Sequence, residues 1–522
     1  MTKQLSDCLN RYRFPKFENS WGDIRRGIEK ESLRVTADGQ LSLLSHPIAL
    51  GSALTNPFIT TDFSEALLEM ITPVSNDVNE CLQVLGNIHQ FTSQNISENE
   101  MLWATSMPCP LKNNEEIPIA QYGSSNIGKL KTLYRNGLHH RYGSTMQAVA
   151  GIHYNFSMPE VFWESYKDIC NFNGSIQEFR TQKYLHLIRN FHRNSWLLIY
   201  LFGASPSACK SFVNGREHNL EELDNSTLFK PYATCLRMSK LGYKSEAQKS
   251  LFVCYNDLQT YVDCLHEAMH TTYAEYEAIN QLPGGTYKQI NTNLLQLENE
   301  FYSTIRPKRN VKHGERPLES LTRSGIEYIE VRALDLDPYS ALGINEEQIR
   351  FLDCFLLHCL LADSPDCNET EFFEVASNVN KVVESGREPD LMLEKESSPK
   401  NLQQWALELI EDVSYSACLL DNAHQSGCYC SSVQSQSEKI KNPELTSSGR
   451  ILTEMKKDSL SFFEFSLKQS KIHHETLIGT KLDGKILQDL RKTSSESLAQ
   501  QDKIEESDRI SFDEFLRKWN KN

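Results

Sequence analysis

Short strand-like segments, in which apolar and polar residues alternate, are mixed with helical stretches before residue 340. A period of two is typical of a β-strand with one buried face. The segment 151–157 shows it most regularly: its apolar side chains share one side, and the other side carries His153, Asn155 and Ser157. The segments 27–35 and 325–335 alternate in the same way. We therefore expect three strands here, separated by turn signals such as 37–39 and 283–285.

From residue 345 onward the spacing of apolar residues becomes helical. Residues 346–362 predict a long apolar helix, and the last thirty or so residues predict a charged, amphipathic surface helix. We accordingly divide the chain into a catalytic core over residues 1–362 and a mostly helical C-terminal region over residues 363–522 that packs on it. No internal repeat at a period of about 20 to 50 residues is visible, which argues against a solenoid or propeller.

The segment 60–73 places an acid, Glu69, within an apolar run. Prolines 57 and 73 limit any helix, and the residues after Glu69 favour a strand. A short helix that puts Glu65 and Glu69 on one face remains an alternative. In both cases Glu69 needs a cation or a salt-bridge partner, because an unpaired buried carboxylate is costly.

Two further segments carry acids in a pattern that suggests metal binding. Glu29 and Glu31 share one face of the expected strand, with Cβ atoms about 6.5 to 7 Å apart. Magnesium is commonly held by a few carboxylates together with substrate phosphates. A solvated edge strand is the alternative. On the strand 325–335, Glu330 and Arg332 also share a face, either as a plain ion pair or with the acid on a metal and the arginine on a phosphate.

The overall charge excludes some classes of protein. The chain has 54 basic and 69 acidic residues and a net charge of −15, which argues against general binding of nucleic acid or anionic membrane. The longest apolar run, 196–204, is far shorter than the roughly 18 residues of a membrane helix. Residues 1–20 show no signal-peptide pattern. The 14 scattered cysteines are typical of reduced thiols, so a cytoplasmic location is expected.

The segment 266–270 matches the H-E-x-x-H signature of zinc peptidases, with His266 and His270 as ligands and Glu267 as base. The extended form of the motif is absent, and we interpret the two histidines as surface residues of a helix. Neither a P-loop nor a G-x-G-x-x-G fingerprint occurs. An ATP-dependent enzyme with this sequence would therefore hold its nucleotide through metals and side chains on a sheet.

Taken together and in order, the four segments resemble the proteobacterial glutamate–cysteine ligases. Further stretches carry the resemblance: 52–55 (Ser-Ala-Leu-Thr), 106–109 (Ser-Met-Pro-Cys), 120–123 (Ala-Gln-Tyr-Gly), 131–135 (Lys-Thr-Leu-Tyr-Arg), 200–206 (Tyr-Leu-Phe-Gly-Ala-Ser-Pro), 231–234 (Pro-Tyr-Ala-Thr), 241–243 (Leu-Gly-Tyr), 298–302 (Glu-Asn-Glu-Phe-Tyr) and 305–309 (Ile-Arg-Pro-Lys-Arg). The resemblance runs from residue 27 to residue 362 and reappears faintly at 445–452. Two positions depart from the family pattern, Lys30 where arginine is common and Cys235 where serine is usual.

The resemblance implies an α+β fold with a glutamine-synthetase-like antiparallel sheet curled into a cup. It also implies that glutamate and cysteine are joined through γ-glutamyl phosphate, with ATP as co-substrate and two or three Mg²⁺ ions. Apart from the resemblance, we expect L-glutamate, L-cysteine and ATP as partners, no nucleic acid or membrane partner, and a monomer. Carried over, the metal ligands are Glu29, Glu31, Asp62, Glu69, His153 and Glu330. Arg332 would meet the transferring phosphate, and the cysteine-binding residues are Phe63, Tyr134, Arg237, Tyr243 and Tyr302.

Other functions fit parts of the pattern. A related ligase could join glutamate to a different amine, and a phosphagen-type kinase could share the fold but stop at phosphoryl transfer. A zinc peptidase would depend on His266 and His270. A binding protein without activity is expected to have lost one or more of the site carboxylates, and here all are present.

Overall fold

The computed structural model describes residues 3–14, 19–242, 247–249, 251–280, 287–311 and 315–521. Its centre is a seven-stranded sheet in the order β2-β3-β1-β5-β10-β9, with β4 also paired to β1. Every pairing in this sheet is antiparallel, as expected for an α+β protein. The strands are β1 (Arg25–Thr36), β2 (Ile59–Thr61), β3 (Leu67–Ile71), β4 (Glu100–Leu102), β5 (Ile152–Ser157), β9 (Ile305–Lys308) and β10 (Tyr328–Leu334).

The three alternating segments and the segment around Glu69 are all strands of this sheet. The alternative of a short helix that pairs Glu65 with Glu69 is wrong, because Glu69 lies in β3. Glu65 precedes that strand, and its carboxylate accepts hydrogen bonds from the backbone N–H groups of His46 and Gln121. The carboxylate of Glu65 is therefore bound to backbone N–H groups and does not pair with Glu69.

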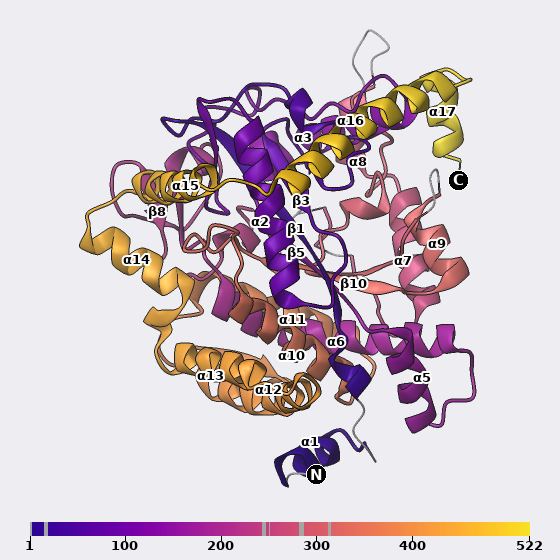
Figure 1. The fold of residues 1–522 in the computed structure, drawn as a ribbon, viewed down its shortest axis with the longest axis vertical. Helices are drawn as coiled ribbons and strands as arrows, with labels where there is room; N and C mark the ends of the chain where they lie inside the picture. The colour runs from indigo at the N-terminus through magenta and orange to yellow at the C-terminus, as the bar shows by residue number, and fades with distance from the viewer. Residues whose placement is uncertain are drawn as a thin grey trace.

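Helices cover one face of the sheet, and α2 runs across the strands in Figure 1. That face is apolar: Ile28, Tyr154 and Val331 are each 0% exposed. It packs on α2 (Val78–Asn95) and α6 (Ile176–Phe202), and α10 (Glu346–Leu361) packs on both helices. Asp353 of α10 links helix to sheet, since it accepts a hydrogen bond from the Tyr154 hydroxyl (2.6 Å) and one from Arg26 (3.0 Å).

The predicted helix 346–362 corresponds to α10, and further helices extend this layer (Figure 1). α12 (Leu402–His424) and α13 (Cys428–Lys441) pack on α10, and α11 (Glu369–Ser385) packs on α6. The hairpin β11 (Met392–Lys395)–β12 (Ser398–Asn401) precedes α12. α15 (Phe462–Gly479) contacts α2 and β4, so the C-terminal region lies against the sheet layer. The domain boundary at residue 362 stays a prediction.

The C-terminal segment differs from expectation, because it forms two helices and not one. α16 (Gly484–Ser507) ends before a short break, and α17 (Phe512–Trp519) begins after it. The Ser511 hydroxyl accepts a hydrogen bond from the backbone N–H of Glu514, which caps the new helix.

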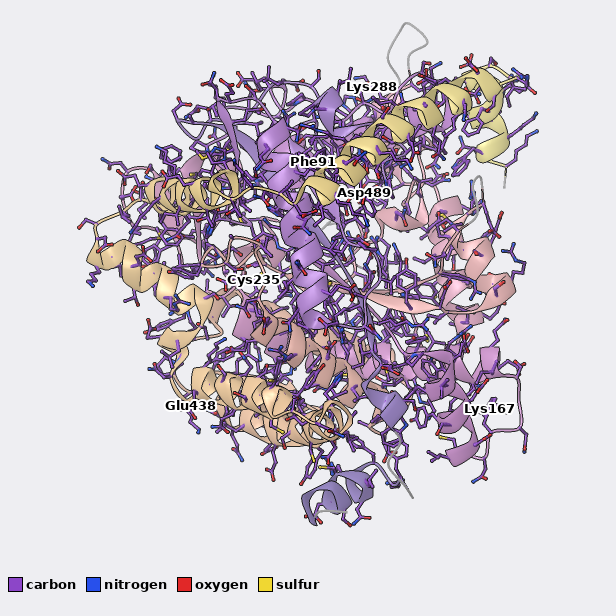
Figure 2. All side chains as sticks on the ribbon, viewed as in Figure 1. Phe91, Lys167, Cys235, Lys288, Glu438 and Asp489 are labelled. Carbon is purple, nitrogen blue, oxygen red and sulfur yellow. The ribbon has the colours of Figure 1, made fainter. Side chains whose placement is uncertain are left out.

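Figure 2 shows the side chains on the ribbon. Those of Glu438 and Asp489 are exposed on helices, whereas Phe91 of α2 is 0% exposed.

The remaining elements complete the covering layers. They are α1 (Lys3–Arg11), α3 (Asn126–Tyr142), α4 (Ser144–Gln147), α5 (Glu160–Ile169), α7 (Leu258–His270), α8 (Ala274–Glu277), α9 (Pro317–Ser324), and a small sheet of β6 (Ser207–Cys209), β7 (Glu221–Glu222) and β8 (Thr227–Phe229). Within the described ranges, none of these helices combines the length and the apolar character needed to cross a bilayer.

Candidate active site

The second face of the sheet gathers acids because of the pairing register. Glu31 of β1 lies opposite Glu69 of β3, and Glu29 lies opposite His153 of β5. Side chains of directly opposed residues point to the same face, with Cβ atoms about 4.5 to 5.5 Å apart. Three strands therefore bring these side chains together on the face opposite to α2 and α6.

His153 lies at the centre of this acidic face. Its Nδ1 is 3.0 Å from Glu29 Oε2 and 3.8 Å from Glu69 Oε1, and its Nε2 is 3.5 Å from Glu31 Oε1. One ligand atom each from Glu29, Glu69 and His153 lies within 4.8 Å of the other two. Such a spacing lets a single cation contact all three groups.

The carboxylates of the acidic face are held under mutual repulsion. Burial, followed by the charges of Glu29, Asp62 and Glu31, raises the pKa of Glu69 well above its usual range. Burial likewise raises the pKa of Glu31. The charge of His153 opposes this increase, and the charge of Asp62 adds to it. Burial also works against ionisation of Glu29, but a hydrogen bond and charge from His153 leave the pKa of Glu29 lowered. A cation among these acids would relieve the repulsion.

Neutral groups orient two of the acids. The side-chain amide of Asn155 donates to Glu29 Oε1 (2.8 Å), and the backbone N–H of Gly151 donates to Glu31 Oε2 (2.6 Å). Asn155 was recognised in the sequence only as part of a polar strand face. These two hydrogen bonds fix the orientation of the carboxylates. Groups that hydrogen-bond to metal ligands typically orient them in this way.

Glu330 of β10 extends the acidic face and carries two cationic partners. It is 1% exposed, with Arg332 Nη1 3.1 Å from one carboxylate oxygen and Lys308 Nζ 3.1 Å from the other. Burial opposes ionisation, but the charges of Lys308 and Arg332 hold the pKa of Glu330 well below its usual range. The local ion pair expected from the sequence thus exists. Lys308 was not among the predicted site residues, because the sequence does not state the register of β9 on β10 that places it near Glu330.

A small cleft of about 40 Å³ opens beside these groups. Asp62, which follows β2, lies on its wall with Arg237, whose Nε is 2.6 Å from Asp335. The predicted site residues that line the cleft are Glu31, Asp62, His153, Arg237, Tyr302 and Arg332. The cleft therefore joins residues from the predicted metal set and from the predicted substrate set.

The other predicted substrate residues have different surroundings. Phe63 is 1% exposed and belongs to the hydrophobic core, and Tyr134 of α3 packs against that core, so neither is on the cleft wall. Tyr243 lies outside the described residues. The Tyr302 hydroxyl accepts a hydrogen bond from Gln147 (2.8 Å), a cleft residue that no sequence pattern indicated.

The H-E-x-x-H histidines lie elsewhere, exposed on α7 as expected for a surface helix. Their rings stack with centroids 4.1 Å apart, and Nδ1 of His270 contacts the carbonyl oxygen of His266 at 2.7 Å. Among the described residues, the group with the spacing of metal ligands is Glu29, Glu69 and His153.

Three comparisons with known proteins agree on one family. The profile of the glutamate–cysteine ligase family matches residues 12–382. A glutamate–cysteine ligase from Saccharophagus degradans is 49% identical over 506 residues, which cover 95% of this chain and 94% of that protein. One from Hahella chejuensis is 46% identical, with 99% of each chain covered.

A solved structure agrees with the sequence comparisons. The crystal structure of a glutamate–cysteine ligase from Francisella tularensis in complex with AMP superposes with a TM-score of 0.90. It is 36% identical in sequence, and the match covers 96% of this chain and 98% of that one.

Proposed function

This chain belongs to the glutamate–cysteine ligase family, and we propose that its acidic sheet face joins L-glutamate to L-cysteine with ATP as co-substrate. The product would be γ-glutamylcysteine, formed in the first step of glutathione synthesis. The observation that carries this proposal is the cluster of Glu29, Glu31 and Glu69 around His153, beside a cleft that contains Arg332. The AMP bound to the Francisella protein supports the use of a nucleotide.

The residues present fit Mg²⁺. The proposed ligands are mainly carboxylates, which are the donors that Mg²⁺ prefers. Burial and the charges of Glu29, Asp62 and Glu31 raise the pKa of Glu69, and a bound cation would offset that repulsion. Two or three ions would be held by Glu29, Glu31, Asp62, Glu69, His153 and Glu330. When bound, such ions supply charge neutralisation for the phosphates of ATP.

The chemistry requires an activated carboxylate. The γ-carboxylate of glutamate attacks the γ-phosphorus of ATP, which forms γ-glutamyl phosphate and releases ADP. The amine of cysteine then attacks the acyl carbon, and inorganic phosphate leaves. Nη1 of Arg332 lies 3.1 Å from a carboxylate oxygen of Glu330, which holds the arginine in place. We propose that its guanidinium donates hydrogen bonds to the oxygens of the phosphoryl group during transfer.

Substrate recognition is assigned to the other wall of the cleft. Arg237 is fixed by Asp335 and by the Leu334 carbonyl oxygen (2.9 Å), which keeps its guanidinium at the cleft for a substrate carboxylate. The Tyr302 hydroxyl is positioned by Gln147. We propose that Arg237 and Tyr302 contact cysteine together with Tyr134 and Tyr243, with Phe63 as a buried support. We also propose that the protein acts in the cytoplasm as a monomer.

The test measures phosphate release with ATP, Mg²⁺ and glutamate, with and without cysteine. We expect strong stimulation by cysteine and formation of γ-glutamylcysteine. Stimulation by a different amine alone would contradict the substrate, and a phosphorylated product without dependence on any amine would indicate a kinase.

A matched pair of variants tests the site. Glu330→Gln should lower kcat by at least about 100-fold, because it removes a carboxylate from the proposed metal and phosphate region. Glu388→Gln, at an exposed position, should keep full activity. Circular dichroism checks that both variants are folded. Full activity of folded Glu330→Gln would refute the assignment of the site.

A further inference from the structure

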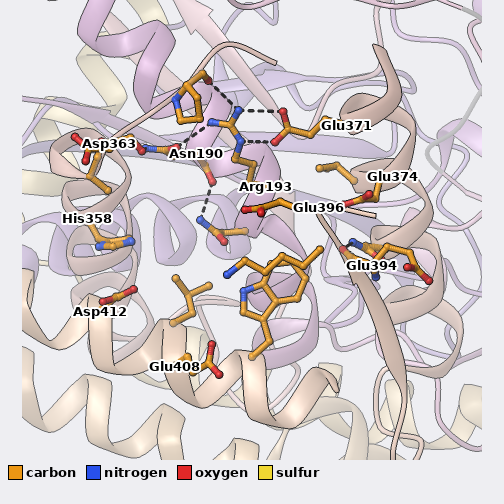
Figure 3. A pocket seen from close by; sticks show the side chains of 18 of the residues that line it. Asn190, Arg193, His358, Asp363, Glu371, Glu374, Glu394, Glu396, Glu408 and Asp412 are labelled. Atoms are coloured by element: carbon orange, nitrogen blue, oxygen red, sulfur yellow. Dashed lines mark hydrogen bonds and ion pairs between the residues drawn. The ribbon is translucent and has the colours of Figure 1, made fainter. Parts of the chain in front are cut away.

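A second cavity lies among the helices and is seen from close by in Figure 3. Its volume is about 790 Å³, and its wall is formed by parts of α1, α6, α10, α11, the β11–β12 hairpin and α12. It shares no lining residue with the cleft beside His153. Small-molecule sites typically have volumes of about 300 to 1,000 Å³.

Most charged groups on this wall are already paired. Arg193 of α6 forms two contacts with Glu371, one of them 3.0 Å from Nη2 to Oε2 (Figure 3). Arg11 pairs with Asp412. These groups have little need of a ligand, because each charge is balanced within the protein.

Three charged groups on the wall form no ion pair with any of the described residues. The carboxylates of Glu374 and Glu396 have no cation within ion-pair distance, and Glu374 only accepts a hydrogen bond from the backbone N–H of Ser397 (2.8 Å). Lys395 forms no ion pair within the described ranges, although its charge adds to the hydrogen bond and charge of Lys400 in lowering the pKa of Glu408, and its Nζ lies 5.4 Å from the centre of the Trp405 ring. The unbalanced groups therefore comprise two negative charges and one positive charge.

Two side chains on the same wall, Trp405 and His358, each have one ring nitrogen without a hydrogen-bond partner among the described residues. Trp405 is 8% exposed, and its indole N–H donates to none of the described residues while staying open to the cavity. His358 is 6% exposed; its Nδ1 contacts the Tyr12 hydroxyl (3.1 Å), and its Nε2 has no partner in the described part of the chain. Burial lowers the pKa of His358 to about 4, so the imidazole adds no positive charge near pH 7. The indole N–H faces the cavity without an acceptor in the described part of the chain, so a ligand that carries an acceptor would gain a hydrogen bond there.

We propose that this cavity binds a free basic amino acid. The two cationic groups of such a molecule match the carboxylates of Glu374 and Glu396. Its carboxylate matches the ammonium of Lys395 and the indole N–H of Trp405. The methylene stem contacts the apolar part of the wall, which includes Leu409. A simple diamine satisfies the acids but offers no acceptor, and a neutral amino acid leaves one of the acids unmatched.

The test is isothermal titration calorimetry on the full chain with L-lysine as the probe and with glutamate at saturation. Norleucine lacks the side-chain amine of lysine, and 1,5-diaminopentane lacks its carboxylate. We expect saturable 1:1 binding of lysine and at least about tenfold weaker binding of both analogues, since each loses a charge-assisted contact. No lysine binding, or equal binding of an analogue, would overturn the proposal. So would a lysine affinity that falls as glutamate is added, because lysine would then occupy the ligase site.

Variants locate the binding site. Glu396→Gln removes one unmatched charge from an exposed hairpin, and Trp405→Phe keeps a ring but removes the N–H donor. Each should weaken lysine binding by about tenfold while the ligase kcat stays within twofold of the parent. Glu388→Gln, an exposed acid outside the cavity, serves as the control and should bind lysine normally. Unchanged affinity in folded Glu396→Gln and Trp405→Phe would place lysine elsewhere and refute the proposal.

Discussion

Replacing Glu69 by Gln removes one carboxylate from the buried cluster while preserving the size of the side chain. Oxygen atoms of Glu69 and Glu29 come within 4.8 Å of each other. At an effective dielectric constant of about 20, two unit charges at that distance repel by about 3 kcal/mol. His153 between them offsets part of this repulsion. We therefore expect Glu69→Gln to raise the free energy of unfolding of the metal-free protein by about 1 to 2 kcal/mol at pH 8.

The sign of the pH dependence follows from the raised pKa of Glu69. Burial and the charges of Glu29, Asp62 and Glu31 make the folded protein hold this proton more tightly than the unfolded chain. The stabilising contribution of protonated Glu69 is complete below the unfolded pKa of about 4.3 and is lost as the pH rises through the folded pKa. The advantage of Glu69→Gln should therefore be absent near pH 4 and grow as the pH increases.

The assay is urea denaturation of both proteins in EDTA at several pH values, repeated with Mg²⁺ and ATP. Ligands that bind the native state stabilise it by mass action, so the parent should gain more from Mg²⁺ and ATP than Glu69→Gln. Glu221→Gln, which removes an exposed acid on β7, is the control and should change neither curve. A less stable metal-free Glu69→Gln, or equal stabilisation of both proteins by Mg²⁺ and ATP, would refute the reasoning.

Further predictions concern positions around the site. Asp353→Asn leaves the guanidinium of Arg26 buried without its counter-charge, so the free energy of unfolding should fall by about 3 to 5 kcal/mol in urea titrations, and a loss below 1 kcal/mol would contradict the role of that pair. Tyr302→Phe removes the hydroxyl that Gln147 contacts; we expect KM for cysteine to rise about tenfold with KM for glutamate unchanged, and a change confined to glutamate would reverse the assignment. His266→Ala should keep the parent kcat in steady-state assays, since the residue is exposed on α7, and loss of activity in the folded variant would reopen its role.

The sequence by itself determined which side chains share a strand face. Along one strand the direction of a side chain depends only on local backbone geometry, so alternation placed Glu29 with Glu31 and left His153 on the polar face of its strand. The long apolar helix at residues 346–362 was predictable for the same reason, since helical spacing is also local. The family resemblance, which the comparisons confirm, supplied the substrates glutamate and cysteine.

The tertiary structure decided which faces meet. The strand register places Glu31 opposite Glu69, and strand packing also brings Lys308 into an ion pair with Glu330. In both cases the two residues lie on separate strands, and no pattern in either segment states the register. Gln147 reaches Tyr302 from a short helix whose sequence carries no such signal. Only packing of the helices creates the cavity at Trp405. Contacts between distant segments depend on how all elements pack together, whereas strand alternation depends on neighbouring residues alone.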